Sequence, residues 1–526
     1  MKKEVVYIHK SDTFSYPPAP FHPPEIFPEL KIHSFSLEID PNNQVYRAVR
    51  ETLIQLGLDK DHIGTAEWKP FRDFVKPGQH VVIKPNFVRG DHPLGEIGVL
   101  SMITHASLMR PVIDYVLLTT GGDCAITICD VPLQSSAWDE IICVSGTRAL
   151  IEFYKQKGFE ISLLDLRREI SHTNDEKVID QREFADRDPL GYAAVDLGGK
   201  SALMPVIQRY KQFMITDYDK GTVGEHHNPK KNEYCIAKTI LDADFFINMP
   251  KLKTHRKAGL TLALKNLIGM NGDKRWIAHH REGSVALGGD EFPRYNLRDW
   301  FEFRLFTFLK RHPAWGGVWL ATQIRKTHRL AFRLKHLIRL KLKKGWASKN
   351  KSVPLMEAGF ETFKKEFPNA SYEVFRELNP NPNQKRFMEG SWYGNDTLWR
   401  TVTDLNHIIF YADKDGCLRE TLQRNYFCLA DGILSGEGEG PMEHLPKKTS
   451  VVMGGLHPLA IDFAAAWIMG FDAKKIPVID RLFGNAMVNY PGLTPTSIEM
   501  RSNVDLAHLN LKFKPSNNWQ GHIERA

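Results

Sequence analysis

Residues 242–270, DADFFINMPKLKTHRKAGLTLALKNLIGM, decide the fold of this chain. The apolar and aromatic run 245–249 predicts a buried strand, which Pro250 ends because proline has no N–H to donate to a neighbouring strand. Residues 251–255 are mostly polar and predict a loop at the end of that strand. After Gly259, apolar residues recur at three and four positions, which predicts a helix packed on a sheet. A strand, a polar loop and a covering helix form the unit from which open α/β sheets build their sites.

The same alternation of strands and helices continues on both sides of this unit. It predicts an α/β fold of two doubly wound, Rossmann-like lobes with a helical basic insertion. Four segments are expected: an N-terminal extension with the first α/β elements (1–75), a core lobe (76–295), the insertion (296–395) and a second α/β portion that closes the core (396–526). The predicted strands are 5–9, 80–83, 124–129, 161–166, 426–430 and 451–453, and the predicted helices are 44–57, 107–118, 139–157, 396–411 and 459–469.

Composition places the chain among ordinary globular proteins. Its 526 residues exceed the usual size of one hydrophobic core. Six cysteines without a CxxC pair argue against a disulfide framework, a zinc site of standard spacing and an iron–sulfur cluster. No apolar run reaches the roughly 18 residues needed to cross a bilayer, and the first residues lack the apolar stretch of a signal peptide. These features favour a cytoplasmic location.

The basic charge of the chain is local. Residues 301–352 hold fourteen Lys or Arg and one acid, a net charge of +13, so the remaining 474 residues carry 8 − 13 = −5. Within this segment, residues 317–344 combine an apolar stripe with a basic face and predict an amphipathic helix. It could dock on the protein itself, meet an acidic partner, or lie on the anionic inner face of a membrane as a peripheral contact. Nucleic acid fits less well, because no aromatics are interleaved on the basic face.

Polar residues gather where predicted strands end, the edge at which α/β sheets bind ligands. Lysines beside the first backbone amides of a helix suit a phosphate, sulfate or carboxylate, and an imidazole can transfer protons near neutral pH. The alternative without a functional site is that the lysines are solvated and that His255 is a hydrogen-bonded loop residue. The predicted catalytic residues are His255, Lys265 and Lys253; the predicted ligand-binding residues are Lys84, Asn86, Lys251, Thr261 and Asn266.

Four carboxylates could hold a divalent metal. Oxygen ligands of this kind suit Mg²⁺ or Mn²⁺, often shared with a phosphate. The glycines and acids of residues 436–441 could equally form a simple turn. The predicted metal ligands are Asp130, Asp431, Glu437 and Glu439.

With these segments in place, the sequence resembles the family called domain of unknown function 362. The resemblance covers most of residues 75–285 and 395–485. Many members of that family carry an appended cysteine-rich, ferredoxin-like segment, which this chain lacks. The matching blocks are Val82 to Asn86, Asp244 to Asn248, Pro250 to His255, Thr261 with Lys265 to Gly269, Asp431, Glu437 to Pro441, and Asp462 with Met469 to Phe471.

A second resemblance, at the level of the fold, is to the nickel-pincer lactate racemases, for which His255, Gly259 and Lys265 are the comparable residues. Two functions are expected. The first is a cytoplasmic enzyme that binds an anionic small molecule or a lipid-linked glycan between two α/β domains, with a divalent metal. The second is a non-catalytic adaptor that its basic helix recruits to a membrane or an acidic partner. The residues do not define a reaction class.

Overall fold

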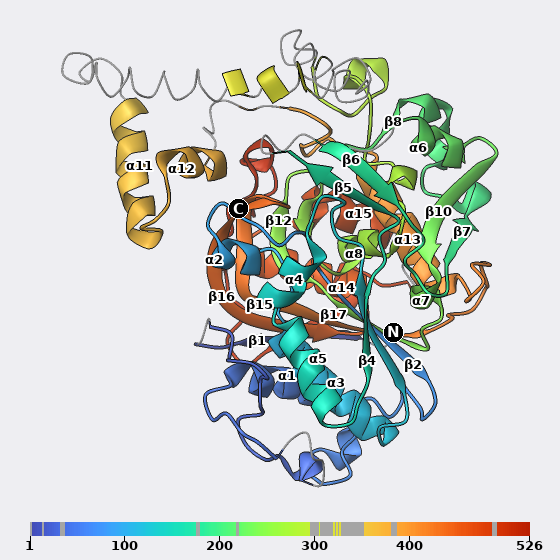
Figure 1. The fold of residues 1–526 in the computed structure, drawn as a ribbon, viewed down its shortest axis with the longest axis vertical. Helices are drawn as coiled ribbons and strands as arrows, with labels where there is room; N and C mark the ends of the chain where they lie inside the picture. Colours follow the sequence, from blue (N-terminus) through green and yellow to red (C-terminus); the bar gives the residue numbers. More distant parts are fainter. Residues whose placement is uncertain are drawn as a thin grey trace.

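One large mixed sheet forms the centre of the computed structural model (Figure 1). The structure describes the chain except for residues 1–2, 13–14, 32–36, 175–178, 217–219, most of 295–351, 380–384, 386, 486–491 and 526. The sheet has ten strands, and eight of them follow one another across it. Their order is β17 (Ile498–Ser502), β1 (Glu4–Lys10), β16 (Glu443–Gly455), β15 (Asn425–Glu439), β11 (Phe245–Met249), β2 (His80–Pro85), β3 (Ala125–Asp130) and β4 (Ile161–Asp165).

The strand pairs from β15 to β4 are parallel, whereas β16 pairs antiparallel with both β15 and β1. The α/β class is therefore confirmed. Strands from both predicted lobes join this single sheet, and the segment after residue 396 contributes three of them. Three smaller sheets lie beside it: β7 (Tyr192–Asp196) with β10 (Lys231–Ala237) and β9 (His227–Asn228); β14 (His280–Arg281) with β8 (Phe213–Met214); and β5 (Glu169–Thr173) with β6 (Ile179–Phe184).

Helices cover both faces of the sheet, and alternate residues of each central strand enter different cores. In β11, Phe246 packs in one core and Phe245 and Ile247 pack in the other, as expected for a strand buried on both sides. The core of Phe245 includes residues of α1 (Gln44–Gln55), α3 (Ala106–Thr120) and α5 (Thr147–Gln156). The core of Phe246 includes residues of α8 (Ala263–Asn266), α13 (Leu398–Tyr411), α14 (Pro458–Met469) and α15 (Pro477–Phe483).

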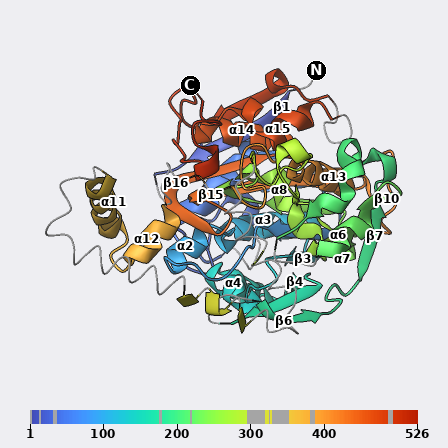
Figure 2. The same ribbon diagram turned by 90° about the horizontal axis from the view of Figure 1, so that it is seen from above.

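The remaining helices are peripheral or short. The pair α11 and α12 projects from one side of the body in both views (Figures 1 and 2). No helix of the described residues is long and apolar enough to cross a membrane. The predicted basic helix 317–344 lies almost entirely outside the described residues. These elements are α2 (Glu96–Leu100), α4 (Trp138–Val144), α6 (Lys220–His226), α7 (Lys238–Leu241), α11 (Ser352–Glu366) and α12 (Tyr372–Leu378).

The predicted loop 251–255 is wrong, because these residues form strand β12 (Lys251–His255). β15 is much longer than predicted and continues past the end of β11, so its backbone groups are open to a further partner. After the bend at Pro250 the chain pairs with this extension, with Lys251 opposite Asp431 and Lys253 opposite Gly436. Of the residues 436–441, for which a simple turn was the alternative, 436–439 are strand, since β15 and β16 continue their ladder to Glu439 and Glu443.

The predicted helix after Gly259 is also wrong at its start. Gly259 has a φ of +83° and begins β13 (Gly259–Thr261), which folds back on β12 as a hairpin. α8 begins only at Ala263, where the Asp462 carboxylate accepts hydrogen bonds from the N–H groups of Ala263 (2.8 Å) and Leu264 (3.3 Å). Thr261 therefore lies on a strand and Lys265 on a helix, instead of both on the predicted helix. The predicted helix 139–157 is split into α4 and α5 at Gly146, whose φ is +76°.

Candidate functional site: a buried lysine cluster

Lys84 and Asp130 form a buried ion pair at the ends of β2 and β3. These strands are parallel neighbours, so their last residues meet at one edge of the sheet. The Lys84 amine lies 2.7 Å from Asp130 Oδ1, and both side chains are almost fully buried, at 1% and 2% exposure. The other carboxylate oxygen accepts from the N–H of Phe87 at 2.6 Å. Asn266 is close enough for its Oδ1 to accept a long hydrogen bond of 3.4 Å from Lys84. The pair is charge-balanced and held in place by backbone donors.

Lys251 and Asp431 form a second buried pair, across the β12–β15 ladder. Their charged atoms are 2.9 Å apart, and neither side chain is exposed. The Tyr16 hydroxyl donates to Asp431 at 2.9 Å and accepts from Lys251 at 2.6 Å. The N–H of His105 also donates to Asp431, at 3.0 Å. Burial and the Asp431 charge raise the pKa of Tyr16 well above its ordinary value. Asp431 is therefore fully engaged by protein donors.

Lys253 and Lys265 have no carboxylate partner among the described residues. Lys253 is fully buried, and its amine donates only to the Met102 carbonyl, at 2.6 Å. Burial, followed by the charges of Lys265 and Lys251, holds the pKa of Lys253 well below its ordinary value. Lys265 is half-buried on α8, and no hydrogen bond or ion pair joins its amine to any described residue. Burial and the charges of Lys274, Lys257 and Lys84 lower its pKa to about 7.

Lys257 and Lys274 complete what we term the lysine cluster: Lys84, Lys253, Lys257, Lys265 and Lys274. The Lys274 amine donates to the Pro132 carbonyl at 3.0 Å, and burial lowers its pKa to about 7. Lys257 donates to Thr216 Oγ1 at 3.0 Å and lies 3.8 Å from Glu389. Among the described residues, Asp130 and Glu389 form ion pairs with lysines of the cluster, and Asp165 lies within electrostatic range of Lys274. The five lysines therefore outnumber these three carboxylates.

Two histidines lie within electrostatic range of this cluster. Burial and the charge of Lys265 hold the pKa of His255 well below its ordinary value, and its Nδ1 accepts from the N–H of Lys257 at 3.0 Å. Burial and the charges of Lys257 and Lys265 similarly depress the pKa of His279. Both rings are therefore neutral at pH 7. Protonating a buried, neutral imidazole costs free energy, so Lys265 is the better general acid or base.

Three buried polar atoms near these residues have no hydrogen-bond partner in the described part of the chain. They are Asn86 Oδ1, Thr261 Oγ1 and His279 Nε2. Thr261 lies opposite Lys253 in the β12–β13 hairpin, and Asn86 precedes Phe87, which donates to Asp130. A buried polar atom in a native protein normally has a partner, which a water molecule or a polar ligand could supply here.

The predicted metal ligands interact with different groups of the protein. Glu437 pairs with Lys447 at 2.9 Å and accepts from the N–H of Lys514, whereas Glu439 accepts from the N–H of Asn517. The contacts with Lys514 and Asn517 hold the C-terminal segment against β15. Among the described residues, no three His, Cys, Asp or Glu side chains are grouped as a metal site would need. A bound divalent metal stays a prediction.

Sequence reasoning missed Lys257, Lys274, His279 and Tyr16. Lys257 directly follows the predicted polar block, and a basic residue next to such a block is a usable signal. Lys274 and His279 lie in irregular segments without periodicity, so only the folded chain brings them to Lys265. Tyr16 comes from the N-terminal extension, far from its partners in sequence.

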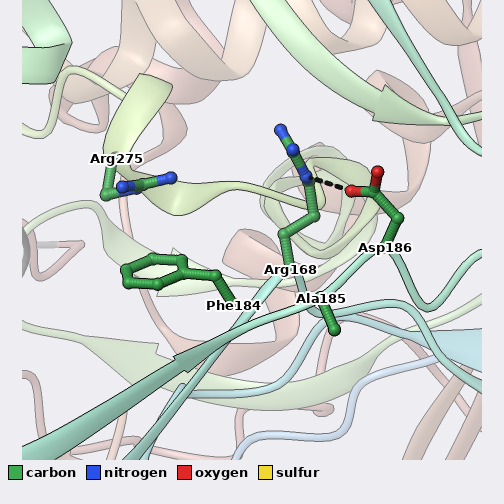
Figure 3. Close-up of a pocket in the computed structure, with 5 residues that line it drawn as sticks. All are labelled: Arg168, Phe184, Ala185, Asp186 and Arg275. Atoms are coloured by element: carbon green, nitrogen blue, oxygen red, sulfur yellow. Dashed lines mark hydrogen bonds and ion pairs between the residues drawn. The ribbon is translucent and has the colours of Figure 1, made fainter.

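A separate pocket of about 310 Å³ opens beside the β5–β6 hairpin (Figure 3). Arg275 lies over the ring of Phe184, 4.5 Å from its centroid, and Arg168 pairs with Asp186 at 2.8 Å. Arg275 is itself bound by Asp273. The arginines here are neutralised by acids, unlike the lysines of the cluster, so the pocket has less attraction for an anion.

Comparison with known families identifies the class of the chain. The model of the family described as domain of unknown function (DUF362) matches residues 191–467, more than half of the sequence. The chain belongs to this family. The matched region contains β11, β12, α8, Asp431 and Asp462, and so most of the lysine cluster. No curated protein and no solved structure matches the chain, and the likeness to lactate racemases is not shown by any of these comparisons.

Proposed function

We propose that this chain is an enzyme that binds a small anionic ligand at the lysine cluster. The observation that carries the proposal is Lys265, a half-buried residue set among other lysines, whose amine has no ion pair or hydrogen bond in the described structure. Burying like charges together costs free energy unless an opposite charge offsets them. An anion beside Lys265 would supply that charge.

The chemistry of the site limits the ligand. Lysines act as point charges with several donors, which suits a phosphate, sulfate or carboxylate group on a small molecule or on a lipid-linked glycan. The hydroxyl of Thr261, the amide of Asn86 and the imidazole of His279 could bind neutral polar groups of the same ligand. An amine that titrates near pH 7 can act as a general acid or base, which supports an enzyme.

Isothermal titration calorimetry with inorganic phosphate, pyrophosphate and sulfate tests the proposal at about neutral pH and low salt, where charged contacts are least screened. A charge-assisted hydrogen bond contributes about 1.5–3 kcal/mol, so Lys265→Met should weaken binding by roughly 10- to 150-fold. Lys155→Met is the matched control, because Lys155 is exposed on α5. Binding of none of the three anions at millimolar concentration, or equal binding by Lys265→Met, would overturn the proposal.

The second candidate is an adaptor function without catalysis. It rests on one observation, the net charge of +13 in residues 301–352. Such a segment would bring the protein to an anionic membrane surface or an acidic partner. Sedimentation with lipid vesicles, described in the Discussion, tests it.

A further inference from the structure

Lys265 differs from the other lysines of the cluster in having an uncommitted amine. Lys84 is bound to Asp130, Lys253 to the Met102 carbonyl, Lys274 to the Pro132 carbonyl and Lys257 to Thr216. The Lys265 side chain is also half-buried, whereas Lys84 and Lys253 are fully buried. A reactive lysine needs both features, an available electron pair and access.

We propose that Lys265 is a nucleophile that forms an imine with a small carbonyl compound bearing a phosphate or carboxylate group. This inference rests on the proposed function, since the neighbouring lysines would hold the anionic group while the carbonyl carbon meets the amine. Desolvation and adjacent cations are the two devices by which proteins keep a lysine neutral and nucleophilic. Both act here, through the burial of α8 and the charges of Lys274, Lys257 and Lys84.

The step is a balanced condensation. The nitrogen lone pair of neutral Lys265 attacks the carbonyl carbon, and the C=O electron pair moves to oxygen. The nitrogen then gives up both of its hydrogens, the C–O bond breaks and one water leaves, so that a C=N bond joins lysine to substrate. Both hydrogens pass to the departing carbonyl oxygen, which leaves as that water. Addition of water reverses the reaction.

Borohydride trapping of the full-length protein tests the inference. The probes are pyridoxal phosphate, an aldehyde that carries a phosphate, and pyridoxal, the same aldehyde without it. At about pH 7.5 an amine with a pKa of about 7 is neutral in roughly three-quarters of molecules, against about one in a thousand for an ordinary lysine. Peptide mapping by mass spectrometry should therefore find the reduced adduct on Lys265 at least ~10-fold faster than on Lys155.

Two comparisons sharpen the test. Inorganic phosphate should slow the labelling of Lys265 by pyridoxal phosphate but leave that of Lys155 unchanged, and pyridoxal should label Lys265 more slowly than pyridoxal phosphate does. Lys265→Arg should lose the adduct, because a guanidinium stays protonated. Phosphate binding without selective trapping at Lys265 would overturn the imine alone and leave the proposed function standing. Absence of both phosphate binding and selective trapping would overturn the two together.

Discussion

Replacing Asp130 by Asn should destabilise the protein more than any exchange of an exposed acid. The change removes the carboxylate that neutralises Lys84, in a pair only 2.7 Å apart whose side chains are 1% and 2% exposed. The loss of one partner from a buried pair leaves the other charge uncompensated, which costs about 3–5 kcal/mol. Asn also presents an N–H₂ group where Asp130 now accepts from the N–H groups of Phe87 and Val131. Each donor left unsatisfied adds about 1–3 kcal/mol, so the free energy of unfolding should fall by at least ~3 kcal/mol.

Urea unfolding followed by tryptophan fluorescence measures this loss. Asp139→Asn is the matched control, because Asp139 pairs with Arg148 at 2.6 Å but the two side chains are 83% and 47% exposed. An exposed pair contributes at most about 1 kcal/mol. The reasoning is refuted if the free energy of unfolding of Asp130→Asn lies within ~1 kcal/mol of that of the control.

Four further outcomes are expected. Sulfate affinity should fall as pH rises through about 7, because Lys265 loses its proton there while sulfate keeps its charge. Since the pKa of Lys265 is lowered on folding, the free energy of unfolding of the ligand-free protein should rise from pH 7 upward relative to that of Lys265→Met, and flat pH profiles would contradict both expectations. Gly269→Ala should destabilise the fold and weaken phosphate binding, because its new Cβ would lie 2.2 Å from Asp130 Oδ1, whereas Gly199→Ala meets nothing within 4 Å. If Mg²⁺ or Mn²⁺ binds the predicted carboxylates, millimolar metal should raise the Tm and Glu437→Gln should abolish the rise; an unchanged Tm would exclude that site. The protein should sediment with vesicles rich in anionic lipid at low salt, and a folded variant should stay in the supernatant when four residues are changed to Gln: Arg325, Arg329, Arg333 and Arg339.

The central strand and its neighbours could be predicted because their signals are local. The run 245–249 is apolar enough to require burial on both faces, and Lys84 and Asp130 follow two other runs of that kind. Parallel neighbours end at one edge of a sheet, so the closeness of these two residues follows once the strands are parallel.

The hairpin of β12 and β13 could not be predicted from its own residues. The apolar spacing of residues 260–268 fits a helix, but the N–H groups at the start of α8 are bound by Asp462, which lies about two hundred positions further along the chain. β12 is a strand because β15 offers it a free edge, again far away in sequence. The hydrogen bonds and ion pairs of the other lysines likewise depend on contacts that no short stretch of sequence contains. The same holds for the absence of such a partner for the Lys265 amine among the described residues.

The position of β1 in the sheet has a consequence for the order in which the protein can be made. Within the described part of the chain β1 pairs with β16 and β17 alone, and Val6 lies opposite Gly455, which is synthesised 455 − 6 = 449 residues later. At about 5–20 residues per second, the ribosome needs roughly 20–90 s to provide that partner. During this time the apolar strand with Val6 and Ile8 has no partner at either edge, so it can aggregate or bind chaperones. Nascent chains that stop before residue 443 should therefore be held by chaperones or precipitate, however well their central strands have formed.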